Sequence, residues 1–403
     1  MISFRRALSQ ATASRLAAVV LLALLPGAAS SKKEPISPES YVGDAKCLSC
    51  HADKQTYLQT AHHLTSRLPT QQTVAGSFRP GQNVMKTTNP DLSFRMDSTA
   101  NGFTETAVIG AAPNAIAHTE RIDLVIGSGR KGQTYLYWKG DRLFELPVSY
   151  WTELNSWVNS PGYGDAFPNF ERPVPPRCLE CHATYFASIA PQSSSNLYKK
   201  SGFILGISCE KCHGLGKEHT ARPASGRTTS AGDAIVNPAK LSRSRQLDIC
   251  AICHAGIGVA PLAPAFSYIP GEPLQDYIEL AVADPSVKID VHGNQVMLLQ
   301  RSRCFQSSPS MSCSTCHNVH VEQRNAAAFS KHCLTCHKEE SCGEFKKKGP
   351  GIAMNCIDCH MPRQESNLIV SGLEGKQVRP KVRSHWIRVY PEDFDGRENS
   401  DRH

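Results

Sequence analysis

Residues 206–220 read GISCEKCHGLGKEHT, and this stretch holds two cysteines and two histidines within eleven positions. The pentapeptide Cys-x-x-Cys-His at its centre occurs seven times in the chain and uses fourteen of the sixteen cysteines. Random placement of 16 cysteines and 16 histidines among 403 residues would give roughly 0.03 copies. The repeat therefore decides how this sequence is interpreted. Its copies contribute the cysteines Cys47, Cys50, Cys178, Cys181, Cys209, Cys212, Cys250, Cys253, Cys313, Cys316, Cys333, Cys336, Cys356 and Cys359, and the histidines His51, His182, His213, His254, His317, His337 and His360.

This spacing of cysteine and histidine is typical of covalent haem attachment. Two cysteines three positions apart can each form a thioether with a vinyl group on one porphyrin edge, and the next histidine then lies under the iron. Zinc is the main alternative, but zinc sites usually combine two half-sites and need no histidine after every second cysteine. Disulfide formation is the second alternative. The sequence predicts seven covalently bound haem c groups, one for each pentapeptide.

Each haem iron has a sixth position, and nine histidines lie outside the pentapeptides. His219 lies six residues beyond His213, and His320 lies three beyond His317, which is too near to reach the opposite face of the same porphyrin. If either binds iron, the iron belongs to a neighbouring haem. The predicted second axial ligands are His62, His118, His219, His292, His320 and His385.

The remaining histidines and the methionines give weaker alternatives. His332 is either an axial ligand or a residue that lies at the surface or binds a propionate. His62 is preferred over the adjacent His63 as a ligand, and His403 is expected in a frayed terminus. A methionine ligand would raise the reduction potential, but methionines more often fill gaps in packing. The two cysteines outside the pentapeptides, Cys304 and Cys342, form either a disulfide or two free thiols.

The N-terminus predicts export. Arg5, Arg6 and Arg15 precede a ten-residue apolar run from Leu16 to Leu25, followed by small residues, which is typical of a signal peptide spanning residues 1–29. No later stretch approaches the eighteen or so apolar residues of a membrane helix, so no transmembrane segment is expected after cleavage. We expect a periplasmic or otherwise extracytoplasmic protein, with an uncleaved anchor as the alternative. Haem c attachment outside the cytoplasm agrees with this location.

Net charge gives no indication of a nucleic-acid partner. Loss of three arginines with the signal peptide lowers the formal charge from +8 to +5. Seven ferric haems, each adding about −1 with its two propionates, would bring the mature protein to roughly −2. The expected partners are therefore redox proteins, and an oligomer or larger complex is possible.

The chain divides by composition. A flexible leader at residues 30–41 precedes a first haem-binding segment, 42–75, and a β-rich insertion, 76–160, whose hairpins are predicted at Asn101-Gly102 and at Lys139-Gly140-Asp141. A six-haem domain, 161–365, and a C-terminal segment, 366–403, follow. Because six pentapeptides leave little room for an apolar core, we expect haem faces to supply much of the buried surface. Short helices, much irregular loop and a small antiparallel β insertion between haems 1 and 2 should surround them, and the family resemblance given below implies that this haem-packed fold is mainly α. The haem-free chain should then be largely unfolded.

Three stretches resemble the multihaem cytochrome c superfamily: SCEKCHGLGKEH at 208–219, CSTCHNVH at 313–320, and CIDCHMP at 356–362 with RSHWIRV at 383–389. This superfamily includes tetrahaem electron-carrier cytochromes, pentahaem nitrite reductase and octahaem hydroxylamine oxidoreductase. The resemblance runs from about Val42 to Tyr390 and is weakest in the β segment. It implies closely stacked haems in a mainly helical protein, with His219, His320 and His385 as sixth ligands.

The departures from those enzymes favour electron transfer. All seven pentapeptides end in histidine, whereas the nitrite reductases use a lysine ligand, and no tyrosine here matches the cross-linked tyrosine of the oxidoreductases. The sequence predicts an exported heptahaem cytochrome that transfers electrons along closely packed, mostly bis-histidine haems. The alternative is a multihaem oxidoreductase that acts on a small nitrogen or sulfur compound at a five-coordinate haem. No catalytic residue is assigned.

Overall fold

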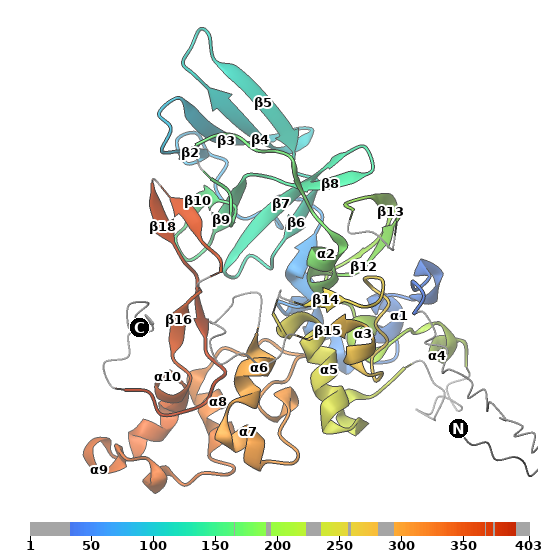
Figure 1. Cartoon of the computed structure of the whole chain (residues 1–403), viewed down its shortest axis with the longest axis vertical. Helices are drawn as coiled ribbons and strands as arrows, with labels where there is room; N and C mark the ends of the chain where they lie inside the picture. Colours follow the sequence, from blue (N-terminus) through green and yellow to red (C-terminus); the bar gives the residue numbers. More distant parts are fainter. Residues whose placement is uncertain are drawn as a thin grey trace, which may run out of the picture. The chain divides into compact units, whose positions relative to one another are not determined.

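The sheets of this protein follow one another through the first half of the chain, and the short helices are concentrated in the second half (Figure 1). The computed structural model describes residues 33–164, 166–190, 195–222, 235–256, 259–280, 294–366, 368–373 and 375–391, all within one unit that spans 33–403. The expected signal peptide, His292 and His403 lie outside the described residues. Helices account for 29% and strands for 26% of the structure, so the expected mainly α, haem-packed fold class is wrong.

The first sheet has four antiparallel strands in the order β2-β3-β4-β5. Alternating apolar residues build it: along β3, Leu92, Phe94 and Met96 are buried, whereas the residues between them are more exposed. The predicted hairpin at Asn101-Gly102 is confirmed, because β3 and β4 pair from Leu92 with Ile109 to Thr99 with Gly102. The strands are β2 (Val84–Lys86), β3 (Leu92–Thr99), β4 (Gly102–Ile109) and β5 (Ile116–Arg121).

The second sheet has seven strands, and β7 is its centre. Strand β7 pairs with β6, β8 and β9, and the predicted hairpin at Lys139-Gly140-Asp141 is confirmed by the pairing of Lys139 with Arg142. The strands are β1 (Ser66–Arg67), β6 (Leu124–Ile126), β7 (Gly132–Lys139), β8 (Arg142–Glu145), β9 (Val148–Trp151), β10 (Ser156–Asn159) and β11 (Arg172–Pro173).

The two sheets share one apolar core. Phe94 and Met96 of the first sheet pack in the same cluster as Tyr135, Tyr137 and Trp157 of the second. These side chains are nearly inaccessible to water, with Met96 and Tyr135 at 0% exposure. This segment therefore buries its own apolar surface, which is the physical reason why the protein is not packed around haem alone.

A further hairpin, β12 (Ala183–Ser188) with β13 (Tyr198–Leu205), follows the second pentapeptide directly. Its side chains Phe186 and Tyr198 pack with Leu179 of α2 (Pro176–His182) in a second apolar cluster. This hairpin is one of the strands that contradict the expected mainly α fold class. The hairpin instead provides an apolar support for the helix that carries Cys178, Cys181 and His182.

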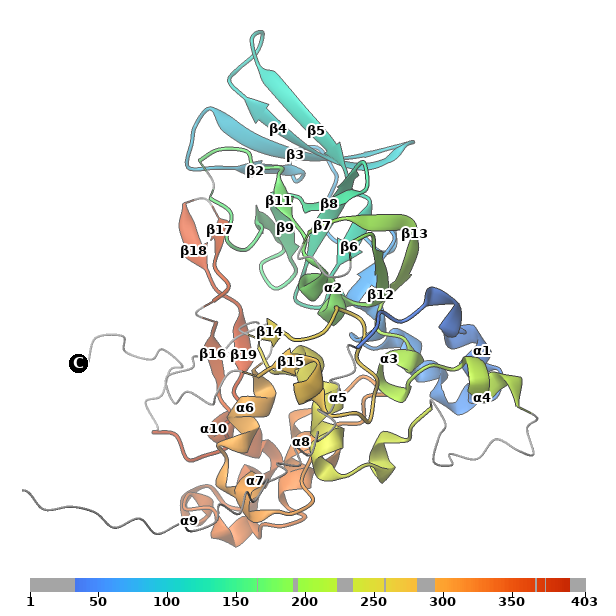
Figure 2. The ribbon, with the colours of Figure 1, turned by 45° about the vertical axis from the view of Figure 1, so that its right-hand side comes forward.

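The remaining helices are short. Only α5 reaches twelve residues among those described, and helices shorter than about twelve residues are unstable in isolation. Figure 2 shows α1, α3 and α4 close together. The α-helices are α1 (Asp44–Leu48), α3 (Cys209–His213), α4 (Lys217–Ala221), α5 (Arg243–His254), α6 (Gln295–Gln300), α7 (Arg303–Ser307), α8 (Ala326–Cys333), α9 (Phe345–Lys348) and α10 (Cys356–His360).

Single 3-10 turns and two-residue or three-residue strands complete the described chain. The 3-10 helices are η1 (Pro38–Ser40), η2 (Ala52–Gln59), η3 (His63–Thr65), η5 (Pro238–Lys240), η6 (Leu274–Asp276), η7 (Cys313–Thr315), η8 (Glu339–Ser341) and η9 (Pro350–Asn355). The short strands pair as β14 (Ala260–Pro261) with β15 (Ile278–Glu279), β16 (Arg363–Glu365) with β19 (Lys381–Arg383), and β17 (Ser371–Leu373) with β18 (Lys376–Val378). No helix in the described ranges is both long and apolar enough to cross a membrane.

Candidate cofactor sites

Every pentapeptide adopts a single helical turn. Four copies lie within or at the end of α2, α3, α5 and α10. In the other three, the histidine N–H donates to the carbonyl of the first cysteine, at 3.0 Å for His51, 2.9 Å for His317 and 3.0 Å for His337. Residues three apart on such a turn lie on the same face, so the two thiols of each copy point to one side. This is the arrangement that attachment to one porphyrin edge requires.

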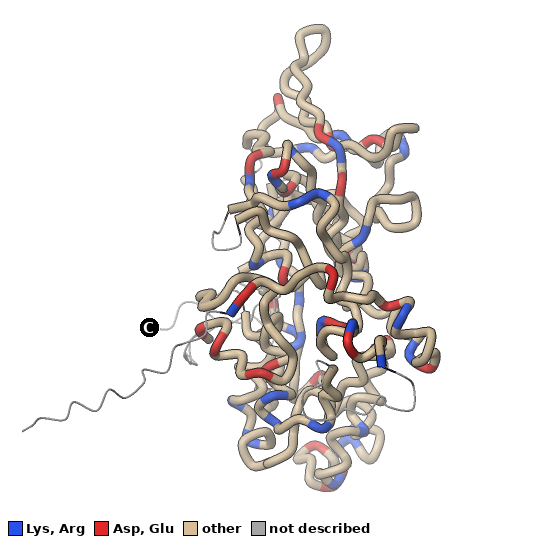
Figure 3. Tube along the Cα trace, turned by 90° about the vertical axis from the view of Figure 1, so that its right-hand side faces the viewer, with Lys and Arg blue, Asp and Glu red and all other residues tan. Residues whose placement is uncertain are grey.

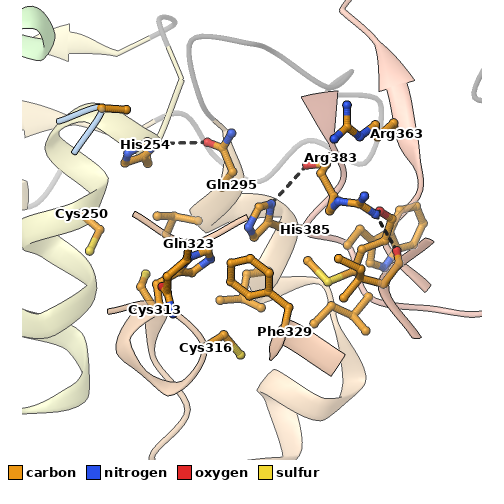
Figure 4. Close-up of a pocket in the computed structure, with 18 of the residues that line it drawn as sticks. Cys250, His254, Gln295, Cys313, Cys316, Gln323, Phe329, Arg363, Arg383 and His385 are labelled. Atoms are coloured by element: carbon orange, nitrogen blue, oxygen red, sulfur yellow. Dashed lines mark hydrogen bonds between the residues drawn. The ribbon is translucent and has the colours of Figure 1, made fainter. Parts of the chain in front are cut away.

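Five pentapeptides line one continuous cavity of about 4050 Å³. They are the copies that begin at Cys178, Cys250, Cys313, Cys333 and Cys356, and all of their cysteines and histidines contribute to the wall. Of its cysteines and histidine, the third pentapeptide adds Cys212 alone. Ordinary small-molecule pockets have volumes of about 300–1,000 Å³. The cavity is therefore large enough for several bulky planar groups side by side. Figure 4 shows part of it, with Cys250, His254, Cys313, Cys316 and His385 around the space.

Three pentapeptide histidines face a histidine from outside the pentapeptides. The ring centres of His213 and His320 are 6.0 Å apart, with 24° between the ring planes. His317 and His385 are 6.2 Å apart at 26°, and His62 and His254 are 6.1 Å apart at 90°. Each pair joins segments remote in sequence. His62, His320 and His385 are all among the predicted second axial ligands.

These separations fit a metal ion midway between the two rings. A metal–nitrogen bond of about 2.0 Å plus about 1.1 Å from nitrogen to ring centre places an ion about 3 Å from each centre. The measured separations of 6.0 to 6.2 Å are twice this value. No three His, Cys, Asp or Glu side chains within the described ranges form a metal-binding group by themselves.

Hydrogen bonds at Nδ1 orient the rings so that Nε2 remains available for a metal. Nδ1 of His213 lies 3.0 Å from the carbonyl oxygen of Val236, and Nδ1 of His385 lies 3.2 Å from that of Arg383. Nδ1 of His254 lies 3.3 Å from Oε1 of Gln295. Metal-binding histidines in proteins are usually oriented in this way, because the partner at one nitrogen fixes the tautomer and ring orientation.

Burial keeps two of these histidines neutral. It is the first cause that lowers the pKa of His62 to about 4, and the neighbouring His254 lowers it further. Burial, followed by the neighbouring His317, likewise lowers the pKa of His385 to about 4. A neutral imidazole has the lone pair that a metal bond needs.

The other histidine candidates occupy different surroundings. His118 lies on β5 with its Nε2 3.1 Å from Glu120 and its ring against Phe170, and the structure does not bring it to a pentapeptide. His219 lies on α4, and its buried Nδ1 has no hydrogen-bond partner among the described residues. His63 lies 3.3 Å from Asp44, and His332 lines the cavity.

Thiols of different pentapeptides meet in three places. Hydrogen bonds between thiols change their pKa values, which shows that the sulfur atoms are close. The thiol of Cys209 lowers the pKa of Cys47, and that of Cys253 lowers the pKa of Cys181 to about 7. The pKa of Cys250 is raised chiefly by its hydrogen bond with Cys313. The attachment edges of the first and third, the second and fourth, and the fourth and fifth sites are therefore adjacent.

Buried carboxylates at the variable positions of two pentapeptides hold neighbouring segments in place. Glu210 is 3% exposed, and its carboxylate accepts the N–H groups of Val42 at 3.0 Å, Gly43 at 2.9 Å and Gly216 at 2.8 Å. Glu180 accepts the N–H of Phe266 at 2.8 Å. Sequence reasoning missed both roles. The only available signal was a glutamate between two cysteines, which is uninformative without knowledge of its burial.

Cys304 and Cys342 are both free thiols in the structure, so the suggested disulfide between them is not formed. Cys304 lies on α7, where the charge of Cys336 contributes to raising its pKa after the larger effect of burial.

Comparison with known proteins gives one family match. The family described as "Cytochrome c554 and c-prime" matches residues 166–214, which contain the second and third pentapeptides. No curated protein and no solved structure matches the chain. The match supports a c-type cytochrome in general, with covalently bound haem c and a role in electron transfer.

Proposed function

We propose that this c-type cytochrome is an exported heptahaem protein that transfers electrons between closely spaced, mostly bis-histidine haems. The observation that carries the proposal is the set of three facing histidine pairs, at 6.0, 6.1 and 6.2 Å between ring centres. Each pair combines the histidine of one pentapeptide with a histidine that sequence alone also selected. In this proposal the third site takes His320, the fourth takes His62 and the fifth takes His385.

Haem c supplies reversible one-electron oxidation and reduction of its iron, at a potential that depends on axial ligands and surroundings. The chain's own residues determine which sites are neighbours. The thiol contacts connect the first site with the third, the second with the fourth, and the fourth with the fifth. His320 adds a connection from the fifth pentapeptide to the third site. Five of the seven sites thus belong to one connected set.

The sixth and seventh sites extend this set through the shared cavity. The helix α8, which ends at Cys333, lies beside α10, since the Cys356 N–H donates to Ser330 at 2.9 Å. Both sites line the same cavity as the fifth. A relay function requires only that the sites be close and differ in potential, and no bound substrate is needed.

The proposed partners are other redox proteins outside the cytoplasm. The signal-peptide sequence of residues 1–29 supports export. In the view of Figure 3, basic and acidic residues are interspersed along the trace, which favours protein partners over a nucleic acid. Oligomers and larger complexes are compatible with the same proposal.

The spin state of the purified ferric protein tests the proposal. We expect pyridine haemochrome analysis to give seven haems per chain, and electron paramagnetic resonance to show chiefly low-spin ferric signals. Addition of nitrite or hydroxylamine should leave these signals unchanged. A dominant high-spin signal that shifts with either compound would favour the alternative, an oxidoreductase with a five-coordinate haem, and a count below seven would contradict the heptahaem assignment.

A further inference from the structure

Arg383 connects the fifth and seventh pentapeptides through its side chain and its backbone. It is the last residue of β19, two positions before His385. Its Nη1 donates to the carbonyls of Ile357 at 2.9 Å and Met361 at 2.8 Å, and its Nη2 donates to Asp358 at 2.7 Å. The guanidinium therefore makes three hydrogen bonds to the seventh pentapeptide and the residue that follows it.

The helix that receives these bonds needs outside support. Helix α10 has five residues, Cys356–His360, so most of its carbonyls lack a partner within the helix. A helix of this length is unstable alone. The planar guanidinium fork can satisfy two carbonyls and a carboxylate together, which a lysine ammonium cannot do in the same fixed geometry. Arg383 thereby fixes the turn that carries Cys356, Cys359 and His360.

The backbone of the same residue fixes a histidine at the fifth site. The Arg383 carbonyl lies 3.2 Å from Nδ1 of His385 (Figure 4). The ring centres of His385 and His317 are 6.2 Å apart. Ser302, which is 0% exposed, donates to the His385 carbonyl at 3.1 Å and accepts the Ile387 N–H at 2.8 Å. The Arg383 carbonyl thus orients the ring of His385, and Ser302 holds the backbone of the same residue.

The same segment returns to the seventh site. The carbonyl of Arg388 lies 3.0 Å from Nδ1 of His360, and the Arg388 N–H donates to the His360 carbonyl at 3.3 Å. The Arg388 guanidinium also stacks on Trp386, 3.8 Å from the ring centre. Residues 383–388 therefore contact one histidine of each site at Nδ1.

We propose that Arg383 is a positioning residue shared by the fifth and seventh sites, orienting His385 and His360 together. The inference rests on the proposed haem ligation at these two histidines. Hydrogen bonds from surrounding residues set the orientation and basicity of metal-binding imidazoles. A change at Arg383 therefore alters the ligand field at two sites, although the residue itself binds neither iron.

The test compares Arg383→Gln with Arg363→Gln in the holoprotein. Arg363 lies opposite Arg383 in the β16–β19 pair and its charge also acts on Asp358, but the described structure assigns its guanidinium no hydrogen bond. We expect Arg383→Gln to shift two low-spin paramagnetic resonance signals, one of them the signal that His385→Ala removes. Arg363→Gln should leave the spectrum unchanged at an equal haem count. A third variant, Arg383→Lys, keeps the positive charge but lacks the planar guanidinium with its fixed N–H donors. It should give smaller shifts of the same two signals.

The outcomes separate this inference from the proposed function. A wild-type protein without low-spin bis-histidine signals contradicts the ligation itself. A wild-type protein with these signals, together with an unchanged or single-signal response in Arg383→Gln, overturns the shared role of Arg383. If Arg383→Gln does not mature, Arg383→Lys decides the question, and a wild-type spectrum in that variant likewise overturns the inference.

Discussion

His320 is held in place by residues that follow the first pentapeptide, although it lies three positions after the fifth. The Thr56 hydroxyl donates to the His320 carbonyl at 2.9 Å, and the Tyr57 ring packs edge-on at 6.1 Å between ring centres. Tyr57 is itself fixed by a 2.6 Å hydrogen bond to the Ile207 carbonyl, just before the third pentapeptide. Three sites thus meet at one histidine.

The substitution His320→Ala should affect the third site alone. Removal of the imidazole that faces His213 at 6.0 Å leaves the third iron without its proposed second histidine. We expect one low-spin signal to be replaced by a high-spin signal, with a higher reduction potential, because a donor to the ferric state is lost. The measurement is paramagnetic resonance combined with a spectroscopic redox titration.

A matched control is His118→Ala. His118 also lies outside the pentapeptides, but it sits on β5 beside Glu120, with a 54% exposed side chain. Its removal should leave every haem signal unchanged. Loss of a low-spin signal in His118→Ala, or an unchanged spectrum in His320→Ala, would show that the ring pairs do not identify the ligands.

For single residues, the sequence indicates which histidines are candidate ligands, but not which pentapeptide histidine each of them lies beside. His320 and His385 were selected from the sequence and the family resemblance, and each lies beside a pentapeptide histidine in the structure. Their partners could not be predicted, because His320 meets His213 only through contacts of Thr56 and Tyr57. The hydrogen bonds by which Glu210 and Arg383 hold distant segments could not be predicted either. Neither the burial of a side chain nor its bonding to remote backbone follows from a local sequence pattern.

Strand β4 carries an ionisable group into the apolar core between the two sheets. Glu105 is 0% exposed, and only one of its carboxyl oxygens has a hydrogen bond, from the Val148 N–H at 3.0 Å. Burial raises its pKa well above 4.5, the Val148 hydrogen bond opposes the shift, and the nearby Glu145 adds to it. Glu105 is therefore protonated in the folded protein at a pH where the unfolded chain is ionised.

This difference predicts that stability falls as the pH rises above 4.5. In that range the folded state binds one proton more than the unfolded state, so the free energy of unfolding decreases by up to about 1.4 kcal/mol per pH unit. The decrease ends when the pH reaches the pKa of the folded state. Glu105→Gln removes the titrating group and should flatten the pH dependence between pH 5 and pH 8. Urea unfolding of both proteins over this range measures the difference.

The control for this prediction is Glu153→Gln, which removes a glutamate from the exposed Lys131 ion pair outside the core. Exposed pairs contribute only about 0–1 kcal/mol. The stability of Glu153→Gln should follow the wild-type pH profile. Parallel profiles for wild type and Glu105→Gln would show that Glu105 is ionised in the folded state.

Hairpins whose turn residues are recognisable in the sequence could be predicted, whereas strands that depend on irregular or long-range pairing could not. The hairpins at Asn101-Gly102 and Lys139-Gly140-Asp141 follow from turn residues between alternating strands. The β12–β13 hairpin was missed because the adjacent pentapeptide suggested helix, and because its register includes irregularities between Ala183 and Tyr185 and between Phe186 and Ser188.

The whole molecule combines two ways of burying apolar surface. The four-stranded sheet β2–β5 and the seven-stranded sheet around β7 together form a β sandwich whose side chains, including Phe94, Tyr135 and Trp157, pack against one another. The cavity of about 4050 Å³ is lined instead by short helices, α2 and those from α5 to α10, and by strands β6, β7, β9 and β10 of the second sheet. The expectation of a haem-packed core missed the β sandwich, because cysteine spacing dominates the sequence and the sandwich has no comparable motif.

This division changes what is expected of the haem-free chain. Produced without haem attachment, the protein should keep its β sandwich, because about 25 cal/mol is gained per Å² of apolar surface buried there, independently of haem. The helices α8 and α10 should be lost, because helices this short are unstable alone and the proposed haems of their pentapeptides are missing. Helix α5 keeps an apolar cluster of its own, in which Ala251 and Ile252 pack with Leu274. Hydrogen exchange measured by mass spectrometry should find strong protection in β3, β4 and β7 and little in α8 and α10. Uniform loss of protection across the chain would instead show that the sandwich depends on haem for its stability.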